Sequence, residues 1–267
     1  MDNSLLPGST ALSEAIEGNL AALLCYCTRV PDALLRHNPE VTAISTGLKS
    51  SFFNAVVSTH LGEHGLDEAI DSILAPFQER GVPLLWWVWP SSRPADPGPF
   101  LMARNFVYRG EGPGMTANLS TVPTNLALPA DVEIEQVRDE ETLKLWLQLG
   151  EEGRAPLDQD YLDFELALGL QEGAPYRRYL ARYNGLPVAG SLLFLDADAA
   201  GLYGVVTLPE ARGKGIGTAV SLMPLLDAWS LGYQVAVLES SPDGFPVYTK
   251  LGFRECCRVK SYIWRPA

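Results

Sequence analysis

The stretch from Arg212 to Thr218 reads RGKGIGT and separates a strand-like apolar run, Leu202–Leu208, from a helix-like apolar run, Thr218–Trp229. Three glycines at alternate positions remove the side chains that keep a ligand away from the backbone. The first N–H groups of the following helix have no intrahelical partner, and they lie at the positive end of the helix dipole. With Arg212 and Lys214 beside it, this turn is predicted to bind phosphate oxygens.

Three classes of phosphate-binding site compete for this turn. A P-loop needs GxxxxGK followed by Ser or Thr, a pattern that the chain lacks. A dinucleotide-binding fold needs GxGxxG after the first strand of a βαβ unit. Here the spacing is GxGxG, and the turn comes after three hairpin-linked strands, so that interpretation is weak. The third class is an acyl-CoA site, in which the turn grips the pyrophosphate of coenzyme A.

The composition limits the domain count and the class of partner. The chain has 267 residues, which suggests about two domains, and 47% of its residues are hydrophobic, enough for a real core. The net charge of −12, from 20 basic and 32 acidic residues, argues against a nucleic-acid-binding protein. It fits a protein whose second substrate is cationic, but a charge that merely keeps the protein soluble is the favoured explanation.

The cysteines and the N-terminal region indicate a cytoplasmic protein without a metal site. The four cysteines occur as two close pairs, Cys25 with Cys27 and Cys256 with Cys257, and neither pair has CxxC spacing or a matching histidine set. Reduced thiols in the cytoplasm are the simple explanation. The apolar run Leu20–Leu24 is too short to span a bilayer and follows acidic residues, so neither membrane association nor a signal peptide is expected.

A linker divides the chain into two predicted domains. The segment Pro113–Pro129 is rich in Pro, Thr, Asn, Gly and Ala, and its end, near Thr121–Ala130, is typical of a linker. The predicted domains are therefore residues 1–125 and residues 131–267, each near the common domain size.

The second domain shows a clear succession of predicted strands and helices. Asn184-Gly185 predicts a tight hairpin turn between the predicted strands Tyr179–Tyr183 and Pro187–Leu195. Pro224 lies inside the long predicted helix and is expected to remove one backbone hydrogen bond. In chain order we expect the strand Val132–Val137, helices Glu140–Leu149 and Leu157–Leu170, strands Tyr179–Tyr183, Pro187–Leu195 and Gly201–Leu208, a helix to Ser230, the strand Gln234–Leu238, a helix Gly244–Lys250, and closing strands through Trp264.

The first domain repeats part of this pattern. The amphipathic helix Asp67–Arg80 leads through Gly81 to the strand Pro83–Trp89, as the long helix leads through Gly232 to the strand Gln234–Leu238. A loop and a short helix then end in Arg104-Asn105-Phe106, which parallels Leu251-Gly252-Phe253. These parallels predict an internal duplication. The counterpart of the glycine turn, residues 60–65, has two glycines but no arginine, so only the second domain is expected to bind the phosphate compound.

Three tryptophans in the first domain resemble a ligand platform, but we interpret them as packing residues. Trp86, Trp87 and Trp89 lie in one predicted strand. Strand alternation is taken to place Trp87 opposite to the other two, which favours core or domain-interface packing.

The second domain resembles the GNAT superfamily of acyl-CoA-dependent N-acyltransferases. Val205–Gly217 (VVTLPEARGKGIG) is similar to the family's strand and R/Q-x-x-G-x-G/A turn, and Ser241–Phe253 (SPDGFPVYTKLGF) is similar to its Y-x-x-L-G-F segment. The order of strands and helices over residues 131–267 agrees as well. The resemblance implies an α/β (α+β) protein of two GNAT-like units, each a mixed, mostly antiparallel sheet flanked by helices, the first unit being degenerate.

The resemblance also implies a donor site for acetyl-CoA. Backbone groups of Val205, Val206 and Thr207 are expected to pair with the pantetheine arm, as an added strand pairs with a sheet edge. The thioester is expected in a split of the sheet between Thr207 and Leu238. The implied pyrophosphate contacts, with Lys214 beside them, come from Arg212, Gly213, Gly215, Ile216, Gly217 and Thr218.

Two residues are candidates for proton transfer. Tyr248 is implied as the general acid for the departing thiolate, since a phenol pKa of about 10 and a thiol pKa of about 8.5 are close. Alternatively, Tyr248 packs its ring in the core and uses its hydroxyl as a hydrogen-bonding handle. An amine with a pKa of about 10.4 must lose a proton before it attacks, and Glu239 is the candidate base because it ends the strand beside the split. Its alternative role is a solvated or ion-paired carboxylate.

The expected reaction is the direct transfer of an acetyl group from acetyl-CoA to a primary amine, with no covalent acyl-enzyme and no metal. The acceptor is a small molecule or a peptide. The first unit is expected to help shape its site without binding coenzyme A, because Leu101 falls about where Tyr248 does. The acidic group Glu151, Glu152, Asp158 and Asp160 either attracts a cationic acceptor or forms a solvated face.

The rival hypothesis is a non-catalytic acyl-CoA-binding or scaffold protein that retains the fold. Aminoglycoside, polyamine, amino-acid, protein N-terminal and lysine acceptors stay open, as does the oligomeric state.

Overall fold

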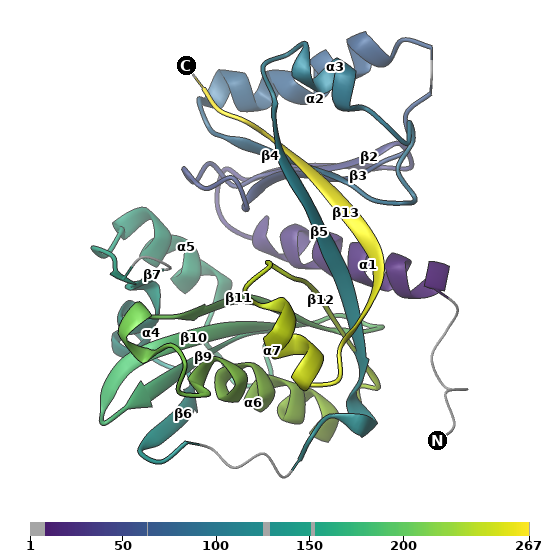
Figure 1. The fold of residues 1–267 in the computed structure, drawn as a ribbon. Coiled ribbons are helices and arrows are strands. Elements are labelled where there is room, and N and C mark those ends of the chain that lie inside the picture. The colour runs from purple at the N-terminus through teal and green to yellow at the C-terminus, as the bar shows by residue number, and fades with distance from the viewer. Residues whose placement is uncertain (1–8, 63, 125–128, 151–152, 267) are drawn as a thin grey trace. The chain divides into compact units, whose positions relative to one another are not determined.

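The computed structural model describes residues 9–62, 64–124, 129–150 and 153–266, which divide into two compact units (Figure 1). Unit 1 contains residues 115–255, and unit 2 contains residues 9–114 together with residues 256–266. The division falls inside the strands β5 (Val107–Asn118) and β13 (Arg254–Trp264). The domains predicted from the sequence, residues 1–125 and 131–267, keep the last strand with the second domain. In the structure, residues 256–266 belong to unit 2.

Unit 1 is built on a mixed, mostly antiparallel sheet with the strand order β12-β11-β10-β9-β6. Successive pairs from β6 to β11 are antiparallel, and β11 and β12 are parallel. Asn184 and Gly185 turn the hairpin between β9 and β10 with φ of 51° and 76°, as an Asn-Gly turn requires. The strand bounds are β6 Val132–Gln136, β9 Tyr176–Tyr183, β10 Leu186–Leu195, β11 Ala200–Thr207 and β12 Val235–Glu239.

Helices cover both faces of the sheet of unit 1. Along β9, Tyr179 packs in one apolar cluster with Val220 of α6, whereas the next residue, Leu180, packs in another with Leu143 of α4 and Leu162 of α5. This alternation explains why α6 lies on one face and α4 and α5 lie on the other. The helices are α4 Glu140–Leu147, α5 Gln159–Leu168, α6 Ile216–Ser230 and α7 Phe245–Lys250, and the short elements are η1 Leu119–Thr121, β7 Leu149–Gly150, β8 Gly153–Arg154 and η2 Pro209–Ala211.

A serine on the sheet compensates for the proline inside α6. Pro224 has no N–H to offer the carbonyl of Val220 one turn earlier. The hydroxyl of Ser191, which is fully buried on β10, donates a hydrogen bond of 2.7 Å to that carbonyl. The helix therefore keeps this buried carbonyl satisfied by borrowing a donor from the sheet.

A buried ion pair fixes α5 against the sheet. The Arg178 guanidinium on β9 donates from Nε to Glu165 Oε2 at 2.6 Å and from Nη2 to the Glu165 carbonyl at 3.0 Å. Tyr176 donates to the second carboxylate oxygen at 3.1 Å, and Arg178 Nη1 donates to the Gly169 carbonyl at 2.9 Å. Both charged side chains are buried, so removing one partner would leave the other charge unpaired in the core.

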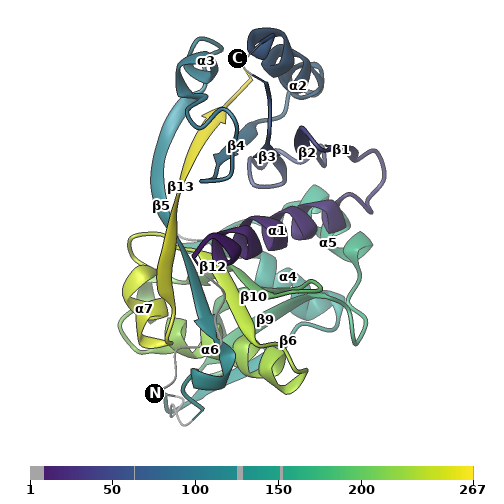
Figure 2. The ribbon, with the colours of Figure 1, turned by 90° about the vertical axis from the view of Figure 1, so that its right-hand side faces the viewer.

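Unit 2 has the strand order β1-β2-β3-β4-β13-β5, and Figure 2 shows β13 alongside β5. The C-terminal strand pairs antiparallel with β4, from Lys260 opposite Val88 to Trp264 opposite Leu84. Apolar residues of α2 cover one face of this sheet, and α1 packs against β2 and β3. The elements are α1 Ser9–Cys27, β1 Leu34–Asn38, β2 Val41–Ser45, β3 Asn54–Thr59, α2 Leu66–Arg80, β4 Leu84–Val88 and α3 Gly98–Met102.

The internal repeat proposed from the sequence is visible in backbone geometry. Helix α2 ends before Gly81, with Val82 donating to the Phe77 carbonyl at 3.2 Å, and α6 ends before Gly232, with Tyr233 donating to the Ala228 carbonyl at 3.2 Å. Both glycines have positive φ.

The short helices repeat in the same way. The Phe106 N–H donates to the Leu101 carbonyl at 3.2 Å, and the Phe253 N–H donates to the Tyr248 carbonyl at 3.0 Å. Asn105 and Gly252, which precede these phenylalanines, both have positive φ. Leu101 therefore does occupy the place in unit 2 that Tyr248 occupies in unit 1.

The tryptophans pack as expected, but the predicted direction of one was wrong. Trp86, Trp87 and Trp89 are all buried. Trp87 and Trp89 stack on each other with ring centroids 6.0 Å apart, whereas Trp86 packs edge-on against Phe106. Residues two apart share a face of a strand, so Trp86, not Trp87, faces the opposite side.

Candidate active site

The glycine turn places three glycines for two different reasons. Gly213 and Gly215 have φ of 76° and 78°, in the left-handed region that side chains disfavour. Gly215 is also the N-cap of α6 and has no side chain with which to cap it. Gly217 does not have a positive φ, but a Cβ added to it would lie 3.2 Å from Thr207 Oγ1. The turn therefore brings bare backbone against the end of β11.

Two cations flank this turn and are tied to nearby backbone. Arg212 Nε donates to the Thr207 carbonyl at 3.0 Å. Lys214 donates to the Glu210 carbonyl, and its ammonium lies 5.6 Å from the centre of the Tyr183 ring. Both side chains are exposed. The positive end of α6 thus presents N–H groups and two positive charges to solvent, which suits an anion such as a diphosphate.

The sheet opens beside this turn. The pairing of β11 with β12 consists of Ala200 opposite Ala236 and Gly201 opposite Val237, although β11 runs on to Thr207. On the side of β11 that faces β12, a split in the sheet therefore borders the backbone of Val205, Val206 and Thr207. An extended ligand arm could add to this edge as a short strand.

A β-bulge distorts β11 at the split. Between the pairs Gly190–Val206 and Leu192–Tyr203, one residue of β10 faces two residues of β11, Gly204 and Val205. Gly204 has φ of 53°. A bulge leaves a backbone group unpaired in the ladder, and bulges often border active sites. An isolated glycine inside a strand is a signal from which sequence reasoning could have predicted this bulge.

Tyr248 lies on α7 with its ring in the core of unit 1. Its ring packs edge-on against Phe253 at a centroid distance of 5.9 Å, and the residue is 9% exposed. Among the residues that the structure describes, no hydrogen bond of its hydroxyl is found. Burial, and secondarily the charge of Glu239, raises the pKa of Tyr248 to about 12. The phenol is thus protonated at neutral pH.

Glu239 ends β12 and is exposed at the split. Its electrostatic effect on the pKa of Tyr248 shows that the structure brings these two side chains into each other's neighbourhood. The ends of β11 and β12 and the start of α7 therefore supply a neutral phenol and a carboxylate to one region.

Sequence reasoning missed Gly244, which accommodates the Tyr248 ring. A Cβ at this position would lie 2.7 Å from Tyr248 Cε2, although the backbone of Gly244 is ordinary, with φ of −75° and ψ of −29°. The lack of a side chain is therefore required by the tyrosine and not by the turn.

The acidic group proposed near the acceptor has another structural role. Asp158 is the N-cap of α5, and its carboxylate accepts from the N–H groups of Asp160 and Tyr161 at 2.9 and 3.3 Å. Asp160 lies in the first turn of the same helix, where a negative charge is favourable. Glu151 and Glu152 lie outside the described residues.

Within the described ranges, no three His, Cys, Asp or Glu side chains are arranged to hold a metal ion. None of the helices in the described part of the chain is both long enough and apolar enough to cross a bilayer.

The geometry of unit 1 defines its class of fold. A mixed sheet that opens between two parallel strands, with a glycine turn at the start of the helix joining them, is the GNAT fold. Residues 140–253 match the model of the Acetyltransferase (GNAT) family. This segment of the chain is therefore similar to the GNAT family, and it contains all the candidate site residues. The predicted resemblance and the predicted fold class are confirmed.

Solved structures share the fold over both units. A GCN5-related N-acetyltransferase from Kribbella flavida has a TM-score of 0.68 and 17% identity, covering 94% of this chain and 96% of its own. A tandem GNAT protein from the clavulanic acid biosynthesis pathway has a TM-score of 0.59 and 15% identity, covering 94% and 95%. A GCN5-related N-acetyltransferase from Sphaerobacter thermophilus has a TM-score of 0.60 and 15% identity, covering 95% and 94%. Comparison with curated protein sequences found no match.

Proposed function

We propose that unit 1 transfers an acetyl group from acetyl-CoA to a primary amine by direct transfer in a ternary complex. The observation that carries this proposal is the juxtaposition of the glycine turn with the unpaired edge of β11. Gly217 lies against Thr207, so a diphosphate at the turn and a pantetheine arm on Val205–Thr207 belong to one continuous ligand. Charge-assisted hydrogen bonds contribute roughly 1.5–3 kcal/mol each, so a few are enough for micromolar affinity.

The proposed chemistry uses Tyr248 and Glu239 as acid and base. The acceptor nitrogen forms a bond to the acetyl carbon after giving a proton to Glu239, directly or through water. The carbon–sulfur bond then breaks as the Tyr248 hydroxyl donates its proton to the sulfur, and the second proton of the nitrogen returns to the Tyr248 phenolate. The products are an amide and the free thiol of coenzyme A, with Tyr248 again neutral. The backbone of the bulge at Gly204 and Val205 lies on the strand that borders the reacting carbonyl.

The raised pKa of Tyr248 is compatible with this role. A phenol with a pKa of about 12 is a weaker acid than a thiol in water, whose pKa is about 8.5. Desolvation raises the pKa of a thiolate in the same apolar region as well, because burial disfavours the charged form. The two groups therefore come closer in proton affinity inside the split.

We further propose that unit 2 does not bind coenzyme A. Gly65 is the N-cap of α2 with φ of 72°, much as Gly215 is the N-cap of α6. However, Asp67 and Glu68 lie in the first turn of α2, and α6 has no acidic residue there. Two carboxylates at the positive end of this helix oppose a diphosphate.

The edge of β3 that corresponds to the free edge of β11 is also occupied. The Arg93 N–H donates to the Thr59 carbonyl at 2.8 Å, and the Leu61 N–H donates to the Arg93 carbonyl at 2.9 Å. The chain's own backbone therefore takes the hydrogen bonds that a pantetheine arm would need. A role of unit 2 in shaping the acceptor site stays a proposal.

Thiol release from acetyl-CoA across a library of amines tests the proposed function. We expect saturable release with at least one primary amine, and we expect Tyr248→Phe to lower kcat by about 10²-fold. Thermal stabilisation by coenzyme A should persist in this variant. Binding of coenzyme A without turnover of any amine would instead support the non-catalytic alternative.

A further inference from the structure

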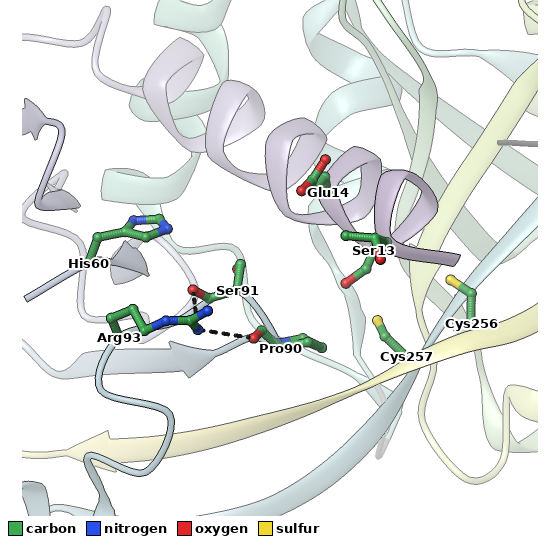
Figure 3. Close-up of a pocket in the computed structure, with 9 residues that line it drawn as sticks. Ser13, Glu14, His60, Pro90, Ser91, Arg93, Cys256 and Cys257 are labelled. Carbon is green, nitrogen blue, oxygen red and sulfur yellow. Dashed lines mark hydrogen bonds between the residues drawn. The ribbon is translucent and has the colours of Figure 1, made fainter. Parts of the chain in front are cut away.

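Unit 2 contains a pocket of about 510 Å³ that the proposed acetyl transfer does not use (Figure 3). Its walls come from the first turns of α1, the residue after β3, the loop after β4 and the start of β13, all within unit 2. This volume lies in the range of small-molecule sites.

The position of the pocket in the repeat is informative. Strands β3 and β4 are parallel and pair at Ala55–Leu85 and Val56–Trp86, as β11 and β12 pair at two positions before they separate. The pocket lies where β3 and β4 end, because His60 follows β3 and Arg93 lies in the loop after β4. It is the counterpart in unit 2 of the split in unit 1.

A fixed guanidinium forms one side of the pocket. Arg93 Nη1 donates to the carbonyls of Ser91 and Ser92 at 3.0 and 2.9 Å, which holds the side chain in place. Among the described residues, its Nε and Nη2 atoms have no acceptor. A planar fork with two remaining donors matches a carboxylate, which it can bind in bidentate fashion. His60 lies on the same side (Figure 3).

A carboxylate forms another side. Glu14 is exposed to the pocket from α1 and has no hydrogen-bond or ion-pair partner among the described residues. Glu17, one turn further along α1, accepts a hydrogen bond from the Ser91 hydroxyl and so ties the loop of Arg93 to the helix. Glu14 is therefore the acidic group available to a ligand. Cys256 and Cys257 contribute sulfur atoms to the wall formed by β13 (Figure 3).

These two charges of opposite sign, neither of which has an ion-pair partner among the described residues, restrict the ligand. The carboxylates repel a multiply charged anion such as a diphosphate, and the guanidinium repels a polyamine. A molecule with one carboxylate and one ammonium group satisfies both. We propose that the pocket of unit 2 binds a small zwitterion of the α-amino acid class, free or as a short peptide, with its carboxylate on Arg93 and its ammonium on Glu14.

The proposal does not depend on acetyl transfer by unit 1 and is tested by binding alone. The full-length protein without coenzyme A is titrated calorimetrically with the standard L-amino acids and with dipeptides, which separates the free and peptide-bound sources. For the tightest ligand, its N-acetyl derivative removes the positive charge and its carboxamide removes the negative charge.

Glu14→Gln is expected to weaken binding of the amino acid and its carboxamide about tenfold or more, and to leave the N-acetyl derivative unaffected. Arg93→Gln is expected to weaken the amino acid and the N-acetyl derivative, and to leave the carboxamide unaffected. Exposed residues of unit 2 outside the pocket supply matched controls, Glu79→Gln and Arg109→Gln, which should bind as the wild type does.

Two measurements keep the test decisive. Arg93→Gln removes bonds that hold its own loop, so Arg93→Lys, which keeps the charge without the fork, and a melting curve accompany it. Glu14→Gln disturbs no partner and should melt as the wild type does. Absence of binding by every compound at millimolar concentration overturns the proposal. So does binding that survives both pocket substitutions, or that is lost in Glu239→Gln, since it would place the ligand in unit 1.

Discussion

At the scale of single residues, the position of the Tyr248 ring depends on a missing side chain. Gly244 has a backbone conformation that alanine adopts readily, yet its Cβ would lie 2.7 Å from Tyr248 Cε2. We expect Gly244→Ala to displace the ring and to lower kcat at least about tenfold, because small displacements of catalytic groups are costly. Steady-state kinetics and a thermal shift with coenzyme A measure the two effects separately.

The matched control for this substitution is Gly18→Ala on α1, where an added Cβ has no atom within 4 Å. We expect it to leave kcat unchanged. A Gly244→Ala enzyme with the kcat of the wild type would show that the ring's position is not required for turnover, which would weaken the assignment of Tyr248 as the acid.

The pH dependence of turnover follows from the pKa of Tyr248. Burial and the charge of Glu239 raise this pKa to about 12, so the hydroxyl keeps its proton at lower pH and loses it only near that value. The ratio of kcat between wild type and Tyr248→Phe should therefore stay constant from about pH 7 to about pH 10, where an ordinary tyrosine would begin to ionise. A ratio that falls within this range would mean that the phenol titrates normally.

At the scale of elements, α6 and β10 are coupled through one hydrogen bond. The Ser191 hydroxyl serves the Val220 carbonyl because Pro224 cannot. We expect Ser191→Ala to lower the free energy of unfolding by about 1–3 kcal/mol, the cost of leaving a buried carbonyl unsatisfied. Pro224→Ala restores an N–H, so the double variant should recover much of this loss in a double-mutant cycle.

Ser221→Ala is the matched control in the same helix. Its buried hydroxyl donates to the Gly217 carbonyl at 2.8 Å, but that carbonyl also lies in reach of the ordinary main-chain donor of residue 221. Its loss should therefore cost less than that of Ser191, as measured by denaturant unfolding. Equal losses, or no recovery in the double variant, would contradict the coupling.

Local patterns predicted the elements well where the signal was local. The glycine turn, the Asn184-Gly185 hairpin and the Y-x-x-L-G-F segment each depend on neighbouring residues, and their geometry followed from the sequence. The parallel between Leu101–Phe106 and Tyr248–Phe253 was likewise predictable from composition and spacing. The facing of the tryptophans also follows from the period of two, which places Trp87 and Trp89 on one face of the strand and Trp86 on the other.

Other features depend on partners far away in the sequence. The buried pair of Glu165 and Arg178 and the donation from Ser191 to Val220 arise only when β9, β10 and two helices come together. The pocket in unit 2 needs residues near 14, 60, 93 and 256 at once. Periodicity in one segment carries no information about such pairings, so the sequence could not predict them.

At the scale of the whole molecule, the C-terminal strand is the largest feature of this kind. Strand β13 follows the last motif of the second predicted domain, yet it pairs with β4 of unit 2 and contributes the buried residues Tyr262, Ile263 and Trp264. Nothing in its alternating pattern distinguishes β4 from any other partner. The strand β13 therefore belongs to unit 2, although it follows unit 1 in the sequence.

This arrangement predicts how the chain responds to being cut. Each buried side chain of β13 contributes about 1.5–3 kcal/mol, so three of them match much of a typical domain stability of about 5–15 kcal/mol. A chain that ends after residue 255 should therefore lose the cooperative unfolding and protease resistance of unit 2, whereas a chain that ends after Trp264 should keep both.

Halves separated between residues 125 and 130 should restore unit 2 only when co-expressed, because the second half supplies β13. A soluble, protease-resistant first half made alone would contradict this requirement, and melting curves with limited proteolysis decide between the outcomes.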